Sequence, residues 1–237
     1  MKMIVGLMSV IAILLVALAG PLYKFGVVEL GTAFTGFKFG LFAGIAALVL
    51  LAIQLLFKRN TASIGSALAS AVFALAAIAV PLSMMNTAKN VPPIHDISTD
   101  LVNPPEFVKI APLRADAPNP VEYTGAEVAE HQRTAYPDLQ TLTYAQSKSK
   151  VVEAAKQAIE NLGWELVNTD ADKGIVEATE TTAWFGFKDD VIIRVTDNDS
   201  ERLVDIRSKS RIGKSDLGKN AARIHALIDE LDNVLAK

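Results

Sequence analysis

The chain has 237 residues, a formal charge of −3 at pH 7 and no cysteine, which excludes disulfides, thiolate nucleophiles, zinc fingers and iron–sulfur clusters. Residues 1–89 carry six basic residues and one acidic residue, and the remainder carries 17 basic and 25 acidic residues, so the two parts have charges of +5 and −8. Because nucleic-acid binding depends on neutralising phosphates, the acidic part argues against a nucleic-acid partner.

Three uncharged apolar runs predict a membrane anchor over residues 1–89. They cover residues 4–22, 39–57 and 64–85, close to the ~20 residues that cross ~30 Å of hydrocarbon. The first run also resembles a cleavable signal peptide, since Ala17-Leu18-Ala19 is typical of a cleavage site. The single basic residue Lys2 and the length of the run favour a retained helix.

The orientation follows from Lys58 and Arg59, in the short loop between the second and third runs. The positive-inside rule places this loop in the cytoplasm. The loop from Tyr23 to Lys38 and the C-terminal domain are then outside, which predicts a multi-pass protein of the bacterial inner membrane with a periplasmic domain. Lys24, Lys38 and Lys89 would lie on the outer side in this orientation, which the positive-inside rule disfavours.

Small residues recur every four positions where the second run begins, at Gly36, Gly40 and Gly44. Such a ridge lets helix backbones approach closely in lipid. It predicts either packing within the three-helix bundle or docking against another integral membrane protein. Membrane lipids and such a protein or complex are therefore the expected partners.

Residues 90–140 form a Pro-rich segment, in which seven of the ten prolines lie between Pro92 and Pro120. Proline at this density argues against a regular helix or a central strand. Interleaved apolar residues nevertheless predict an extended strap that packs along the domain: Ile94, Ile97, Leu101, Phe107, Val108 and Ile110.

From this segment on, the chain resembles the bacterial and plastid domain-of-unknown-function family numbered 1499. The matching words are IHDISTD with the following NPPEF, then NPVEY, QRTAYPD, TTAWFGFKDDVIIRV and RSKSRIGKSDLGKNAARI. The resemblance implies a shared domain that membrane helices commonly precede. It brings no established activity, cofactor or catalytic residue.

Residues 141–237 predict an α+β core of order β-α-β-β-β-β-α, with both helices on one face of an antiparallel sheet. The strands are expected at 141–144, 164–168, 174–182, 190–196 and 203–211, and the helices from an N-cap at Ser149 to about 162 and from about 216 to 236. The other face of the sheet is expected to be solvated, and it carries Glu177, Thr179, Thr181, Arg194, Thr196, Asp205, Arg207 and Lys209.

The segment before the last helix is a candidate anion or partner site. It differs from a Walker A loop by Ser208 in place of the first glycine, which argues against a nucleotide site. A helix N-terminus beside arginines still favours an anion, unless Ser215 or Asp216 caps the helix. The candidate residues are Arg207, Arg211, Gly213, Lys214, Ser215, Asp216, Asn220 and Arg223.

Trp184, Phe185 and Phe187 crowd three aromatic rings between two predicted strands. Such a cluster favours docking to a partner or to the membrane interface. The alternative is that the rings close the core beneath the strap.

The remaining polar candidates are His95, Asp96, Asp100, Asp189 and Asp190. Their spacing matches no known metal triad, no cofactor is implied, and no nucleophile lies in a recognisable elbow. The first hypothesis is therefore a non-enzymatic accessory, assembly or stabilising subunit of a membrane protein complex. A module that binds lipid headgroups or another anion is the second hypothesis, and a hydrolase-like enzyme is the third.

Overall fold

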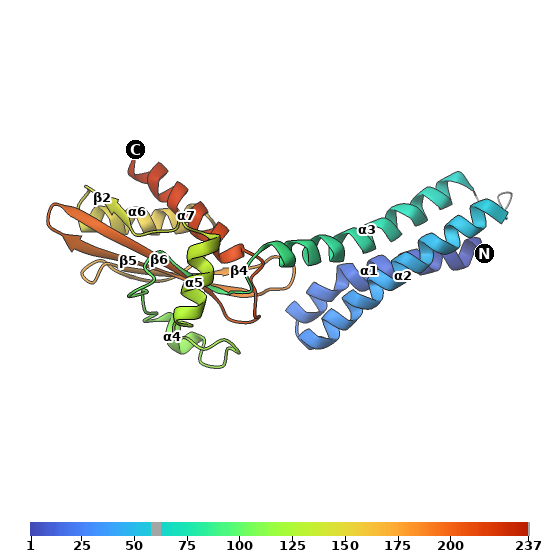
Figure 1. The fold of residues 1–237 in the computed structure, drawn as a ribbon, viewed down its shortest axis with the longest axis horizontal. Helices are drawn as coiled ribbons and strands as arrows, with labels where there is room; N and C mark the ends of the chain where they lie inside the picture. Colours follow the sequence, from blue (N-terminus) through green and yellow to red (C-terminus); the bar gives the residue numbers. More distant parts are fainter. Residues whose placement is uncertain (58–62, 237) are drawn as a thin grey trace. The chain divides into compact units, whose positions relative to one another are not determined.

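A computed structural model describes residues 1–57 and 63–236 of the chain. Its contacts divide the chain into two compact units, whose elements Figure 1 labels. The first unit contains Met1–Lys89 together with Ala183–Gly186, and the second contains Asn90–Thr182 and the chain from Phe187 onward. Lys58 and Arg59, on which the predicted orientation depends, lie outside the described residues.

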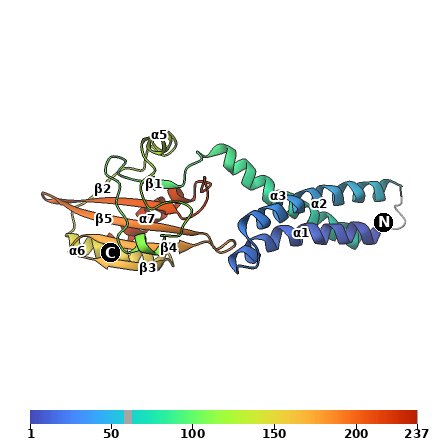
Figure 2. The same cartoon turned by 90° about the horizontal axis from the view of Figure 1, so that it is seen from below.

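Three helices of the first unit are long and apolar enough to cross a membrane: α1 (Lys2–Lys24), α2 (Leu30–Phe57) and α3 (Ile64–Asn90). Helices α1 and α2 lie side by side (Figures 1 and 2). Helix α2 begins nine residues before the apolar run, so Lys38 lies inside a helix and not in the expected loop. A charge interrupts a hydrocarbon span but not a helix, and residues 30–38 contain no proline to break one.

The glycine ridge of α2 lies against other helices of the same chain. A Cβ atom built on Gly40 would lie 2.6 Å from Cγ2 of Val16 in α1 and 3.0 Å from the carbonyl oxygen of Ala12. A Cβ built on Gly44 would lie 3.0 Å from the carbonyl oxygen of Ala74 in α3. The ridge thus allows two neighbouring helices to approach α2 closely, which is the intramolecular use of such residues.

The second unit is built on a six-stranded antiparallel sheet, and this confirms the predicted α+β class. The strands pair in the order β1-β6-β5-β4-β3. Strand β1 pairs with residues 207–209 of β6, and β2 pairs with residues 202–204 of the same strand. Their bounds are β1 (Asp96–Ser98), β2 (Leu142–Tyr144), β3 (Glu165–Asp170), β4 (Ile175–Thr181), β5 (Lys188–Asn198) and β6 (Glu201–Ser210).

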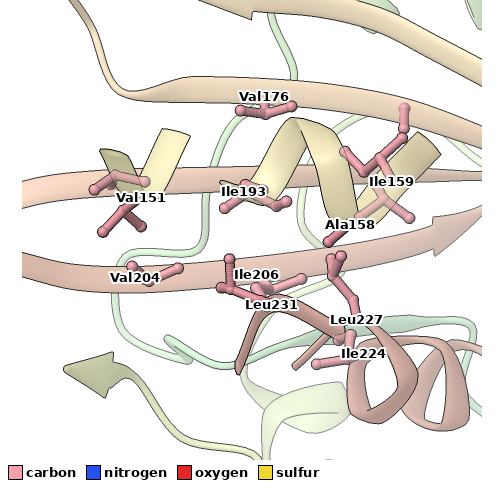
Figure 3. Packing of buried hydrophobic residues seen from close by; sticks show 14 of the residues in the cluster. Val151, Ala158, Ile159, Val176, Ile193, Val204, Ile206, Ile224, Leu227 and Leu231 are labelled. Carbon is pink, nitrogen blue, oxygen red and sulfur yellow. The ribbon is translucent and has the colours of Figure 1, made fainter. Parts of the chain in front are cut away.

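Two helices cover one face of this sheet, α6 (Lys148–Asn161) and α7 (Lys219–Leu235). Helix α6 begins two residues earlier than expected, because Ser147 and not Ser149 is the N-cap and accepts a hydrogen bond from the amide of Lys150. Figure 3 shows the apolar core between helices and sheet. Its labelled side chains are Val151, Ala158, Ile159, Val176, Ile193, Val204, Ile206, Ile224, Leu227 and Leu231, and all are fully buried.

The Pro-rich segment covers the other face and contains regular structure that its prolines argued against. Besides the edge strand β1, it holds the short helix α4 (Ile110–Leu113) and helix α5 (Ala126–Ala135). The rule against a central strand holds, because β1 lies at an edge of the sheet. The helices avoid the cost of proline, because Pro112 lies within the first turn of α4, where its missing amide costs nothing, and α5 contains no proline.

The expectation of a solvated sheet face is wrong for the residues beneath this segment. Phe107 and Ile110 pack on Ile192 of β5, and the polar side chains beside Ile192 are buried. The buried polar residues of this face are Glu177, Thr179, Asp190, Asp205, Arg207 and Lys209.

Replacement of Gly40 by leucine tests the packing of the ridge. The new side chain would collide with Val16 and the α1 backbone, and overpacking of this kind costs about 1–3 kcal/mol. We expect a lower thermal midpoint by circular dichroism in detergent. Gly31→Leu in the same helix is the matched control, because a Cβ atom there meets nothing within 4 Å. Equal midpoints for the two variants would contradict the role of Gly40.

Candidate functional site

Asp96 of β1 lies between two cations of β6. Its Oδ1 atom accepts a 2.9 Å hydrogen bond from Nε of Arg207, and its Oδ2 atom accepts one from Nη2 of Arg207 and one from Nζ of Lys209, both 2.9 Å. The three residues are at most 1% exposed. The antiparallel register places Asp96 opposite Lys209 and Ser98 opposite Arg207, so the strand pairing itself brings the charges together.

Asp190 of β5 holds a second group of ion pairs on the same face. Nε and Nη2 of Arg211 each donate a 2.8 Å hydrogen bond to its carboxylate, in the bidentate geometry that guanidinium favours. Arg114, which follows α4, donates from Nη1 at 3.2 Å, and Thr179 of β4 donates from its hydroxyl at 2.8 Å. The strap is thereby tied to β4, β5 and β6.

Aromatic rings lie against the cations of both groups. The guanidinium carbons of Arg207 and Arg114 lie 5.0 Å and 5.5 Å from the centroid of the Phe107 ring. The Tyr123 ring lies 5.4 Å from the guanidinium of Arg207. Cations over ring faces at these distances are attracted by the ring quadrupole. The buried Tyr123 hydroxyl has no partner among the described residues, and burial raises its pKa to about 12.

Glu177 of β4 is a fully buried carboxylate that binds backbone amides. It accepts hydrogen bonds from the amides of Val108, Lys109 and Ile110 at 2.7–3.2 Å, and one from the side chain of Asn168 at 3.0 Å. These amides lie at the start of α4, whose N-cap residue makes no side-chain cap of its own. A strand residue therefore caps the short helix of the strap.

We call these residues, with the Arg194 pairs to Asp100 and Asp205, the strap layer. Its five cations and five acids balance to zero formal charge at pH 7. Burial opposes the ionisation of Asp96, but the hydrogen bonds and charges of Arg207 and Lys209 outweigh it and hold the pKa of Asp96 below its ordinary value. The members are Asp96, Asp100, Arg114, Glu177, Asp190, Arg194, Asp205, Arg207, Lys209 and Arg211.

The predicted anion site at the start of α7 is filled by the chain itself. The carboxylate of Asp216 accepts hydrogen bonds from the amides of Gly218 at 2.8 Å and Asn220 at 2.7 Å, and Ser215 accepts one from the amide of Leu217. Burial raises the pKa of Asp216. The amide donors that an anion would need are thus used by a cap, the alternative that the sequence also offered.

The structure also separates the cations predicted for that site. Arg207 and Arg211 belong to the strap layer, whereas Arg223 of α7 lies on the helix side of the sheet and binds Asp189 at 2.7 Å and Glu180. Asn220 bridges this group by hydrogen bonds to Ser208, Ser210 and the carbonyl of His95. Gly213 and Lys214 are exposed in the loop between the two groups.

The weaker polar candidates do not converge either. Asp189 and Asp190 point to opposite faces of the sheet, and Asp100 accepts hydrogen bonds from the amides of Val102 and Asn103 as well as from Arg194. Nδ1 of His95 lies 3.4 Å from the carbonyl oxygen of Lys214. Within residues 1–57 and 63–236, no group of three His, Cys, Asp or Glu residues is placed to hold a metal ion.

Two of the predicted docking aromatics belong to the first unit. Nε1 of Trp184 donates a 3.1 Å hydrogen bond to the carbonyl of Ala17, and the Phe185 ring stacks on Phe34 at 5.7 Å between centroids. Phe187 belongs to the second unit, where its amide donates to the hydroxyl of Thr182 at 2.9 Å.

Sequence reasoning missed Arg114, Tyr123 and the burial of Glu177. The one available signal was an arginine and a tyrosine inside a strap already expected to pack on the domain, while the charges of one sheet face were expected to be in water without specific partners.

The comparison with known families gives a match over most of the second unit. A family model described as "Protein of unknown function (DUF1499)" matches residues 96–231, from β1 to the last turns of α7. No curated protein matches the chain.

Replacement of Asp96 by asparagine tests the strap layer. The variant leaves Arg207 and Lys209 buried without their carboxylate, and breaking a buried pair in this way costs about 3–5 kcal/mol. We expect a correspondingly lower urea midpoint for the second unit's transition in the full chain. Asp197→Asn is the control. The Asp197 side chain is exposed in its ion pairs with Lys148 and Arg202, and exposed pairs contribute about 0–1 kcal/mol.

The cost of Asp96→Asn depends on pH with a defined sign. Since the folded pKa of Asp96 is below its ordinary value, its contribution is complete above about pH 4 and is lost as the pH falls through the lowered value. The gap between the two urea midpoints therefore narrows on acidification. A gap that stayed constant from pH 7 to pH 3 would show that the carboxylate charge is not what stabilises the strap.

Proposed function

Since the chain belongs to the DUF1499 family, whose description names no activity, we propose its function from the chemistry of its surfaces: a non-enzymatic accessory subunit that docks on a membrane protein complex and stabilises it. The observation that carries the proposal is the use of the polar side chains. Beneath the strap, Asp96 pairs with Arg207 and Asp190 pairs with Arg114, and at the start of α7 Arg223 pairs with Asp189 and Asp216 binds backbone amides. Buried networks whose members are paired in this way rigidify the part of the domain that contains them, which favours a structural role.

The docking surface of the proposal is α3. Of the three candidate spans it is the least buried, and its buried residues are Ser70, Ala74, Ala77 and Pro81. The other side of α3 exposes large apolar side chains, among them Leu68, Val72 and Leu75. An apolar transmembrane helix of another protein is the partner that this chemistry fits, because packing is the main attraction between helices in lipid.

Photo-crosslinking from α3 tests the proposal. A photoreactive phenylalanine analogue at Val72 or Leu75, which are 60% and 54% exposed, should give one discrete protein adduct in native membranes. The same analogue at Leu7 of α1, which is 62% exposed, is the matched control and should give lipid adducts only. In cells that lack the chain, a native gel should show less of the complex that contains the cross-linked partner. Free monomer with lipid adducts from every position would overturn the accessory role.

We propose further that the second unit is periplasmic and that the helices cross the inner membrane. The support is the Lys58–Arg59 pair between α2 and α3 and the positive-inside rule.

The absence of native cysteine makes this topology directly testable. Cysteine introduced at the exposed Ser200, between β5 and β6, should react with an impermeant maleimide in cells whose outer membrane has been permeabilised. Cysteine at the exposed Ser63, just before α3, should react only after the inner membrane is opened. The reverse pattern of labelling would invert the topology and move the second unit into the cytoplasm.

A further inference from the structure

The first unit includes four residues that are not part of its helices, Ala183–Gly186. We infer that this segment is embedded in the headgroup layer of the lipid bilayer, with the Trp184 indole at the boundary between headgroups and hydrocarbon. The inference does not depend on the proposed accessory role.

Two glycines shape the contact between this segment and α1. A Cβ atom built on Gly20 would lie 2.5 Å from Cδ1 of Trp184, so only glycine leaves room for the indole. Gly186 has φ +69°, and a Cβ atom there would lie 2.7 Å from Cγ of Lys24. The segment therefore lies directly against the last two turns of a candidate membrane span.

The depth of the segment follows from the rise of α1. Nζ of Lys24, at the end of the helix, donates a 3.1 Å hydrogen bond to the carbonyl of Ala183, whereas Nε1 of Trp184 donates to the carbonyl of Ala17. Ala17 and Lys24 are seven positions apart, which corresponds to about 10 Å along the axis. A charged helix end belongs in the headgroup layer, which is about 5–8 Å thick on each side of the hydrocarbon. The indole then lies close to the inner limit of that layer.

The chemistry of the neighbouring residues fits lipid at this depth. Trp184 is half-buried, and its ring lies 5.8 Å from that of Phe37. Phe25 and Phe39 of the same unit are exposed, and Lys24 and Lys38 supply cations beside them. Amphipathic rings with flanking lysines are the residues that anchor membrane proteins at the interface.

Fluorescence quenching tests the inference on the full chain in phosphatidylcholine vesicles. The chain has two tryptophans, so Trp164→Phe leaves Trp184 as the only tryptophan, which can be excited selectively over tyrosine. We expect phosphatidylcholine brominated near the headgroup to quench Trp184 at least twice as strongly as phosphatidylcholine brominated near the chain ends. Trp184→Phe is the matched control, because the remaining Trp164 packs on the core of the second unit and should not respond to brominated lipid.

A second variant separates the contact from folding. Gly20→Leu fills the space of the indole, and it should abolish the preference for shallow bromine while the helical circular dichroism stays unchanged. Three results overturn the inference: equal quenching of Trp184 and Trp164, stronger quenching of Trp184 by deep bromine, or complete quenching of Trp184 by aqueous iodide without a response to brominated lipid.

Discussion

Asp96 binds Arg207 and Lys209 with one carboxylate, out of contact with water. Taking three charges out of water costs several kcal/mol per ion, and the cost is offset only where the remaining donors also find acceptors. Here the carbonyls of Pro105, Val121 and Glu122 accept those donors, and all three belong to the strap. The strap must therefore follow one path over the sheet, because any other path leaves a buried cation without a partner. Apolar packing alone would hold the strap less specifically.

The same constraint explains why the two faces of the sheet differ. On the helix side, α6 and α7 pack on the sheet mainly through apolar side chains, and the buried polar groups gather around Arg223 at the start of α7. On the strap side, β1 contributes only three residues, and a slip of one residue would turn Asp96 away from Lys209. The ion pairs thus set the register of an edge strand too short to set its own. Glu177 likewise fixes the place of α4, a helix of four residues, by binding the amides of Val108, Lys109 and Ile110 at its start.

Periodicity in the sequence was enough to predict the three long helices, the order of strands and helices after residue 141, and the side of the sheet that α6 and α7 cover. It was not enough for the strap layer. Alternating polar residues look the same whether they face water or a covering segment, and Asp96 and Arg207 are separated by 111 residues. The cap at Asp216 lay within reach of sequence reasoning, because a short acid before a helix is a local signal. A pairing between distant charges has no such local signal.

The glycines of the first unit limit what kind of partner its helices can bind. Gly20 receives the Trp184 indole, Gly40 receives α1 and Gly44 receives α3, so these close-approach positions are occupied within the chain. A partner helix would instead meet the exposed face of α3, whose large side chains hold backbones farther apart. In the proposed accessory role, contact there would depend on the shape of leucine, valine and phenylalanine side chains and not on close backbone approach. An interface of this kind distinguishes partners by side-chain volume, so conservative changes of size at Val72 and Leu75 would alter it more than changes at the glycine ridge.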